Sequence, residues 1–292
     1  MKLEHLFFEG LAAPRRRPAP AARPRTWIAQ PAVPVDAEAE QFLQQIFAAP
    51  GLRLDAYRAR ALMRRVSACL RYLRVNSVRE ASARLERDER LRGELLNVVL
   101  LGVTGFFRDT TVFHALEREV IPELARKTAR LRIWSAACSD GLELYSIAML
   151  LAEKGWLRSS ELLGTDLRST AIDRARAGIF GVETLENLEP RWRDVYLQQN
   201  ATTVAVAPFL RQAVRWVAAD LLQEVAPGPW HLLLWRNMAI YLDGEVADTL
   251  WARLCAEVAD GGFLVVGKAD RPPKRLPLVR VAPCIFQKRI AG

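Results

Sequence analysis

Small and acidic side chains follow two apolar runs of this 292-residue sequence. Cys138-Ser139-Asp140-Gly141 comes directly after the run Leu131–Ala137, and Asp166 comes directly after Glu161–Thr165. If both runs are parallel strands, these residues lie beyond their carboxyl ends, where open α/β sheets bind ligands. A carboxylate there can accept hydrogen bonds from both hydroxyls of a ribose, although a lone acid after a strand can also cap the next helix.

The turn after the first run limits the kind of nucleoside. Its small residues let a ligand approach the backbone, but their spacing is not the G-x-G-x-x-G that cradles a pyrophosphate. We therefore expect adenosine joined to something other than phosphate, and S-adenosylmethionine fits best.

A third strand end carries paired polar residues. The apolar run His231–Trp235 is followed by Arg236-Asn237, with Tyr241 shortly after. Such a pair either lines a site at the sheet edge or forms a salt-bridged strand terminus.

A turn before the first strand, Thr104–Asp109 (TGFFRD), adds a candidate cation. Two adjacent aromatic residues cannot both face one core, so we expect Phe106 or Phe107 to line a cleft. Arg108 beside them is a candidate clamp for an anion.

Strand and helix patterns alternate over the second part of the chain. Strands are expected at residues 131–137, 161–165, 215–218, 231–235, 263–267, 278–282 and 285–288, and helices at 145–154, 170–177 and 245–259. This order predicts a parallel sheet with helices on both faces.

The region before it reads as a small all-helical unit, with helices expected at residues 38–48, 55–75, 78–85 and 88–101. In the helix 55–75, apolar residues fall on one face and arginines on the other, among them Arg60, Arg64 and Arg71. An arginine face of this kind is either solvated or a binding surface.

Composition limits the function classes. Hydrophobic residues make up 51% of the chain, and no run of about 18 apolar residues could span a membrane. The four cysteines are scattered and there are three histidines, so no metal site is expected. The net charge of +9 is concentrated between Arg53 and Arg79. Residues 1–35, rich in proline and arginine and not typical of a signal peptide, are expected to be a flexible tail of a cytoplasmic protein.

These motifs, in this order, resemble the CheR family of chemotaxis-receptor methyltransferases, which are protein-glutamate O-methyltransferases. The matching segments are TGFFRD at 104–109, IWSAACSDGLELYSIAM at 133–149, GTD at 164–166, ARAGIF at 175–180, ADLL at 219–222 and RNMAIYLD at 236–243. The resemblance implies a Rossmann-like class I methyltransferase domain at 104–292, with a small β-subdomain at about 196–214, after a helical N-terminal domain at 36–103.

The resemblance also implies the site. S-adenosylmethionine, with S-adenosylhomocysteine as product, would be held by Thr104, Arg108, Glu143, Asp166, Asp220, Leu221, Trp235 and Arg236. Arg108 and Tyr241 would flank the transferring methyl. A glutamate acceptor is already ionised at neutral pH because its pKa is near ~4.3, so no general base is needed.

Partners follow from the same reading. The arginines at 60, 64 and 71 are expected to bind an acidic helical protein such as a chemoreceptor cytoplasmic domain. Docking of a receptor tether is not expected, because the loop Gln199–Thr203 lacks glycine. A monomer that neither inserts into membranes nor binds nucleic acid is expected.

Two alternatives stay open. The family pattern S-T-G-E-E-P-Y is Ser139–Tyr145 here, with Asp140 and Leu142 departing from it, and an Asn of the family is Asp220. These departures favour, as one alternative, a catalytically weakened or inactive scaffold module in a chemosensory pathway. The positive charge suggests, as the other, a methyltransferase acting on RNA, but the arginine face lacks aromatic residues that stack on bases.

Overall fold

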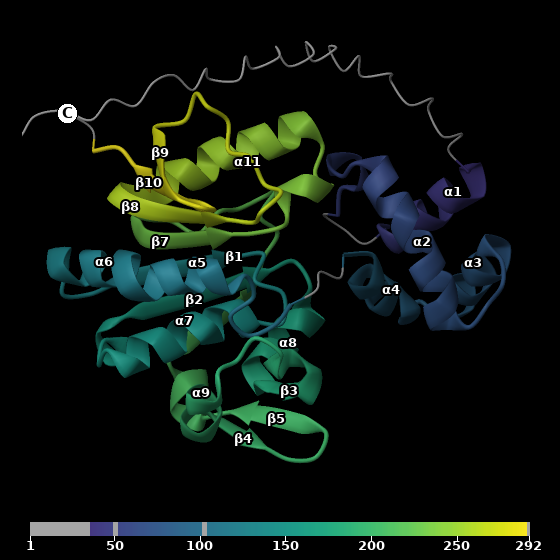
Figure 1. The fold of residues 1–292 in the computed structure, drawn as a ribbon. Coiled ribbons are helices and arrows are strands. Elements are labelled where there is room, and N and C mark those ends of the chain that lie inside the picture. Colours follow the sequence, from purple (N-terminus) through teal and green to yellow (C-terminus); the bar gives the residue numbers. More distant parts are fainter. Residues whose placement is uncertain (1–35, 49–51, 101–103, 291–292) are drawn as a thin grey trace, which may run out of the picture. The chain divides into compact units, whose positions relative to one another are not determined.

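The computed structural model describes residues 36–48, 52–100 and 104–290 (Figure 1). The expected tail, residues 1–35, lies outside the described residues. No helix in the described ranges is both long enough and apolar enough to cross a bilayer.

Four helices form the first part of the described chain: α1 (Ala37–Ile46), α2 (Ala59–Leu73), α3 (Val78–Arg87) and α4 (Leu91–Leu100). Phe42, Leu62 and Leu95 are fully buried among them. Helix α2 begins later than the sequence pattern suggested, because Leu54–Ala56 form a 3₁₀ turn and Tyr57 is extended. Tyr57 pairs as an isolated antiparallel bridge with Leu242, so tertiary pairing overrides helix propensity at this position.

The main sheet has seven strands in the order β6-β2-β1-β7-β8-β10-β9. Their bounds are β1 (Arg132–Ala136), β2 (Glu161–Asp166), β6 (Val214–Ala218), β7 (Trp230–Trp235), β8 (Val258–Val266), β9 (Leu278–Ala282) and β10 (Ile285–Lys288). The first five strands in space are parallel, whereas β10 is antiparallel to both of its neighbours. The chain builds outward from β1 through β2 to β6 and then returns to the other side of β1 with β7, so the strand order reverses at β1.

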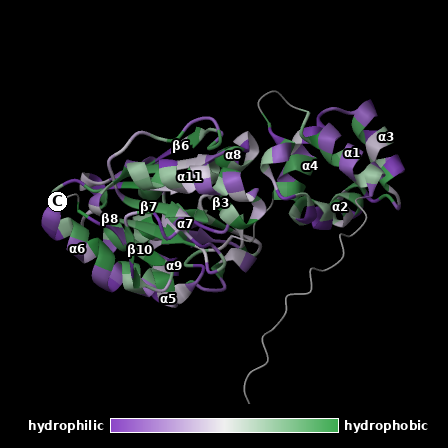
Figure 2. Ribbon diagram, turned by 90° about the horizontal axis from the view of Figure 1, so that it is seen from above, coloured by the Kyte–Doolittle hydropathy of each residue, from purple (hydrophilic) through white to green (hydrophobic). Residues whose placement is uncertain are grey.

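Helices cover both faces of this sheet (Figure 1). Alternate residues of β1 divide between the faces: Ile133 packs with α7 (Leu142–Glu153), and Trp134 packs with α11 (Gly244–Glu257). Helix α8 (Ser169–Ala177) adds Ile172 and Ala175 to the first face. The strands are largely hydrophobic along their length, and hydrophilic residues concentrate on helices and loops (Figure 2). The expected α/β architecture, with its helical region first, is confirmed.

A continuous helical stretch before β1 had no counterpart in the sequence analysis. It consists of α5 (Thr110–Ala115), a π turn (Leu116–Val120) and α6 (Ile121–Lys127), and it buries Phe113, Leu116 and Leu124. The π turn breaks the 3.6-residue periodicity, and Pro122 lies inside the pattern, which explains why the period was not evident.

A second, antiparallel sheet consists of β3 (Ile179–Gly181), β5 (Thr203–Val206) and β4 (Leu197–Gln199) in that spatial order. The short helix α9 (Pro190–Tyr196) comes directly before β4 in the chain, and the short helix α10 (Pro208–Gln212) follows β5. β3 precedes the segment 196–214 in which this sheet was expected. Residues 36–292 form one compact unit, so a domain boundary at residue 103 stays a prediction.

Candidate functional site

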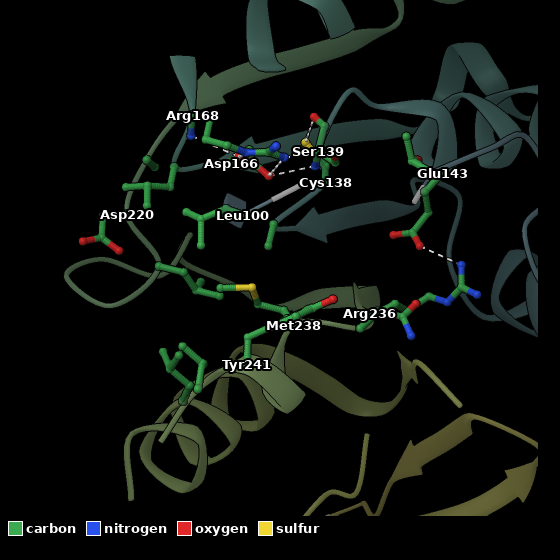
Figure 3. Close-up of a pocket in the computed structure, with 18 of the residues that line it drawn as sticks. Leu100, Cys138, Ser139, Glu143, Asp166, Arg168, Asp220, Arg236, Met238 and Tyr241 are labelled. Atoms are coloured by element: carbon green, nitrogen blue, oxygen red, sulfur yellow. Dashed lines mark hydrogen bonds and ion pairs between the residues drawn. The ribbon is translucent and has the colours of Figure 1, made fainter. Parts of the chain in front are cut away.

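A cavity lies at the carboxyl ends of β1, β2 and β7, where the strand order reverses (Figure 3). Its space of about 1030 Å³ includes a part open to solvent. Eight residues of the sequence-derived set line it: Thr104, Arg108, Glu143, Asp166, Asp220, Leu221, Arg236 and Tyr241.

Backbone strain is concentrated around this cavity. Seven described residues other than glycine have positive φ, and five of them lie in the turns that border or adjoin the cavity: Phe107, Asp109, Ala137, Ser139 and Asn237. Left-handed backbone costs an L-residue roughly 1–2 kcal/mol and persists where the surrounding structure enforces it. The turns after β1 and β7 are therefore held in place by their surroundings.

Asp166, the last residue of β2, is buried in the wall of the cavity. Its Oδ1 accepts hydrogen bonds from the backbone N–H and the Nε of Arg168, both at 3.0 Å. Its Oδ2 accepts the backbone N–H of Ser139 at 2.8 Å. Arg168, and not Asp166, is the N-cap residue of α8, so the capping alternative for Asp166 is wrong.

A buried ion network forms one end of the cavity (Figure 3). Arg236 donates to Glu143 Oε2 at 2.8 Å and to Asp109 Oδ2 at 2.6 Å, and its side chain is 4% exposed. Glu143 Oε1 accepts from Ser135 at 2.9 Å, and Lys268 pairs with Asp109 Oδ1 at 2.6 Å. Arg236 is thus a salt-bridged residue at the end of a strand that also lines the cavity.

The pKa of Asp109 reflects opposing influences. Burial acts most strongly and favours the neutral acid, but the hydrogen bond from Lys268 and the charges of Arg236, Lys268 and Arg108 outweigh it. The net effect lowers the pKa of Asp109, so this carboxyl is ionised and balances the two cations that touch it.

Arg108 reaches the cavity from the turn before α5. Neither of the two preceding rings lines this cavity: Phe106 is fully buried against Phe180, and Phe107 packs on Phe113 and Trp192. A left-handed φ of 50° at Phe107 turns its side chain to a different part of the same core. Phe107 instead borders a separate cleft beside His114 and Trp192, so the expectation that one of the two rings lines a cleft is confirmed there.

Asp220 lies at the other end of the cavity (Figure 3). The backbone N–H of Leu222 donates to its Oδ1 at 2.9 Å, and the amide of Gln223 donates to its Oδ2 at 3.1 Å. These bonds orient the carboxylate. Leu221, Leu222 and Leu250 give this end apolar walls.

Tyr57 is a lining residue that sequence reasoning missed. It comes from the segment before α2 and is 6% exposed. Burial, and after it the charges of Asp220 and Asp166, raise the pKa of Tyr57. The sequence offered no signal for it, because its place depends on pairing with Leu242, far away along the chain.

Tyr241 is held by two contacts of its short 3₁₀ turn (Ala239–Tyr241). Its carbonyl accepts the N–H of Arg58 at 2.8 Å, and its N–H donates to the carbonyl of Met238 at 3.0 Å. Asn237, which precedes this turn, is held by Asp270: the Oδ2 of Asp270 accepts the backbone N–H of Asn237 at 2.6 Å and that of Gly267 at 2.8 Å. Burial raises the pKa of Asp270 despite these bonds. The loop after β7 is therefore fixed from two sides.

Trp235 does not line the cavity, which corrects its place in the sequence-derived set. It is fully buried, with its ring centroid 4.3 Å from that of Trp251 on α11. Side chains alternate along a strand, so Trp235 faces α11, and the chain turns to the cavity at the next residue.

The three arginines of the candidate docking surface are exposed on α2 and lie outside the cavity lining. These residues are Arg60, Arg64 and Arg71. Arg58, the N-cap of the same helix, donates its Nε to the carbonyl of Leu242 at 2.7 Å. The helix that carries the arginine face is thus hydrogen-bonded at its start to the loop that carries Tyr241.

The residues present fit an adenosyl ligand with a charged substituent. Three carboxylates and three guanidinium groups line the cavity, between apolar walls at one end and an ion network at the other: Glu143, Asp166, Asp220, Arg108, Arg168 and Arg236. Small side chains at Ala137 and Ser139 leave the backbone after β1 accessible. Carboxylates suit sugar hydroxyls and an ammonium group, and guanidinium groups suit a carboxylate.

Comparison with known proteins matches the sequence of this chain to one family. The family model "CheR methyltransferase, SAM binding domain" matches residues 102–282. The chain is 28% identical over 222 residues to the chemotaxis protein methyltransferase of Listeria monocytogenes, covering 76% of this chain and 85% of that protein. It is 31% identical over 222 residues to chemotaxis protein methyltransferase 1 of Pseudomonas aeruginosa, covering 70% and 81%. With chemotaxis protein methyltransferase Cher2 of Pseudomonas putida it shares 28% identity over 263 residues, covering 85% and 96%.

Proposed function

Because this chain belongs to the CheR methyltransferase family, we propose that it methylates glutamate side-chain carboxylates of a chemoreceptor or related signalling protein. The observation that carries the proposal is the convergence of Arg108, Glu143, Asp166 and Tyr241 from separate segments on one cavity. Bound S-adenosylmethionine supplies an electrophilic methyl group on a sulfonium.

The donor's parts match the two ends of the cavity. Asp166 and Asp220 both line the cavity, and we propose that Asp166 accepts hydrogen bonds from the sugar and Asp220 from an exocyclic amine of the base. Glu143 offers negative charge to an ammonium group, while Arg236 keeps Glu143 in position through the 2.8 Å bond. Arg108 is the cation for the donor's carboxylate or the acceptor's.

The acceptor needs orientation rather than deprotonation. A glutamyl carboxylate is ionised at neutral pH, and none of the described residues that line the cavity is a histidine. Tyr241 is the group proposed to contact the reacting centre, and Arg108 the group proposed to position the carboxylate. A tight ion pair with Arg108 would reduce the nucleophilicity of the carboxylate. Turnover is therefore favoured when Tyr241 contacts the reacting centre and Arg108 only positions the carboxylate. Alignment within ~3–3.5 Å supplies most of the acceleration.

The exposed arginines of α2 form the proposed docking surface for the acceptor protein. Arg60, Arg64 and Arg71 lie on the solvent side of a helix that contains no acid. An acidic helical bundle, such as a receptor cytoplasmic domain, complements this charge. The bond from Arg58 to the Tyr241 carbonyl connects the docking helix to the loop at the reacting centre.

The remaining features of the proposal concern partners and location. The turn between β4 and β5 is closed by Asn200, whose Oδ1 accepts from the N–H of Thr202 and from Thr203. We propose that this glycine-free turn docks no receptor tether. The protein is proposed to act in the cytoplasm as a monomer without nucleic acid.

Transfer of labelled methyl groups tests the function. The purified chain is incubated with S-adenosylmethionine labelled in its methyl group and with a lysate of its native host. Methyl esters of carboxylates are base-labile, so the proposal predicts labelled protein that releases volatile label at alkaline pH. The matched control is Asp166→Asn, which should label far less. Base-stable label, or label in RNA, would overturn the proposal.

A further inference from the structure

Arg168 occupies acceptor capacity that a bound sugar would use. A carboxylate oxygen has two lone pairs, so Asp166 can accept about four hydrogen bonds. Oδ1 already accepts two bonds of 3.0 Å, one from the N–H and one from the Nε of Arg168. Oδ2 accepts Ser139 N–H at 2.8 Å and a long hydrogen bond of 3.5 Å from Arg168 Nη2.

The guanidinium of Arg168 is held firmly in this position. Its Nη2 also donates to the Ser139 hydroxyl at 3.0 Å. The side chains of Arg168 and Asp166 are 5% and 7% exposed, and both residues line the cavity. A paired, desolvated guanidinium of this kind does not leave its carboxylate without a compensating partner.

We propose that Arg168 determines how the site recognises the donor's sugar: it fills Oδ1 of Asp166, so that a single ribose hydroxyl can bind the acid, on Oδ2, where it displaces only the long 3.5 Å bond from Arg168 Nη2. This inference rests on the proposed binding of an adenosyl donor. Without Arg168, Oδ1 would keep the backbone bond and regain one lone pair, so the same acid could accept both hydroxyls. Arg168 is therefore a specificity-determining residue that weakens the grip on the sugar.

Deoxy analogues of S-adenosylhomocysteine test this proposal without any substitution. The dissociation constants of the parent compound and of its 2′-deoxy and 3′-deoxy forms are measured by calorimetry. In the unmodified protein, one analogue should bind roughly 10-fold more weakly than the parent and the other within about 2-fold, because one hydroxyl contacts the charged acid. Comparable losses for both analogues, or for neither, would overturn the inference and leave the proposed function intact.

The variant Arg168→Ala supplies the second arm. Because the variant frees one acceptor position on Asp166 Oδ1, its affinity for the parent compound should rise. Both deoxy analogues should then bind roughly 10-fold more weakly than the parent compound. The matched control is Arg174→Ala, on the same helix, which removes a partly exposed pair with Asp140 (2.9 Å) and should keep the wild-type pattern. If neither the wild type nor Arg168→Ala binds the parent compound, the donor site itself is wrong. Unchanged parent affinity in a folded Arg168→Ala variant would contradict the inference.

Discussion

Replacing Arg236 by methionine probes the ion network that forms one end of the site. The guanidinium is 4% exposed and bridges Glu143 at 2.8 Å and Asp109 at 2.6 Å. Without it, the one hydrogen bond left to the Glu143 carboxylate within the described part of the chain is that from the hydroxyl of Ser135, whereas Asp109 keeps Lys268 at 2.6 Å. Removal of one partner from a buried pair costs about 3–5 kcal/mol, so we expect the free energy of unfolding to fall by that amount.

Urea denaturation followed by circular dichroism measures this loss. With a slope of about 1–3 kcal/mol per molar urea, the midpoint should fall by at least ~1 M at unchanged slope. The matched control is Arg275→Ala, which removes an exposed pair with Asp248 and should change the unfolding free energy by less than ~1 kcal/mol.

A double variant separates charge from packing. Glu143→Gln combined with Arg236→Met removes the carboxylate that lost its cation, and the amide oxygen can still accept from Ser135. The double variant should be less destabilised than the sum of the single variants by ~1–3 kcal/mol. Additive losses, or a loss below ~1 kcal/mol for Arg236→Met alone, would refute the reasoning that this end of the site is a coupled network.

Three further predictions concern turnover, docking and pH. Tyr241→Phe should lower kcat by roughly 10–100-fold with donor affinity unchanged, because one hydrogen bond to a charged centre is lost; an unchanged kcat would remove Tyr241 from the reacting centre. Changing Arg60, Arg64 and Arg71 together to Ala should raise KM for the acceptor roughly 10-fold at low salt and leave donor affinity intact; equal loss of both would contradict a docking role. The pKa of Asp109 is lowered in the folded protein. Its charge therefore contributes fully to the free energy of unfolding above the ordinary pKa of about 3.9, and this contribution is lost as the pH falls through the lower pKa of the folded state. The stability gap between wild type and Asp109→Asn should therefore narrow below about pH 4, and a gap constant with pH would show that the charge of Asp109 contributes nothing.

The sheet and most of its site residues were predictable because each signal is local. Buried parallel strands are continuous apolar runs, and the residues directly after them, such as Asp166 and Arg236, must lie at one edge of the sheet. The spatial order of the strands in the sheet cannot be predicted from such local runs. The reversal at β1 emerged only from the pairing of β1 with both β2 and β7.

The residues that sequence reasoning missed or misplaced depend on tertiary contacts. Tyr57 reaches the cavity because its backbone pairs with Leu242, and a helix pattern across residues 55–75 concealed the extended segment. Arg168 resembles an ordinary solvated arginine at a helix start, yet it is buried against Asp166. Trp235 belongs to the core because strand alternation, and not proximity to a motif, decides the face of a side chain.

Titration calorimetry with S-adenosylhomocysteine tests the central claim most directly, namely that the cavity at the ends of β1, β2 and β7 holds the methyl donor. One molecule should bind per wild-type chain, and Asp166→Ala, if folded as judged by circular dichroism, should bind at least ~10-fold more weakly. No heat at high ligand concentration, or equal affinity in the folded Asp166→Ala variant, would contradict the assignment of this cavity as the donor site.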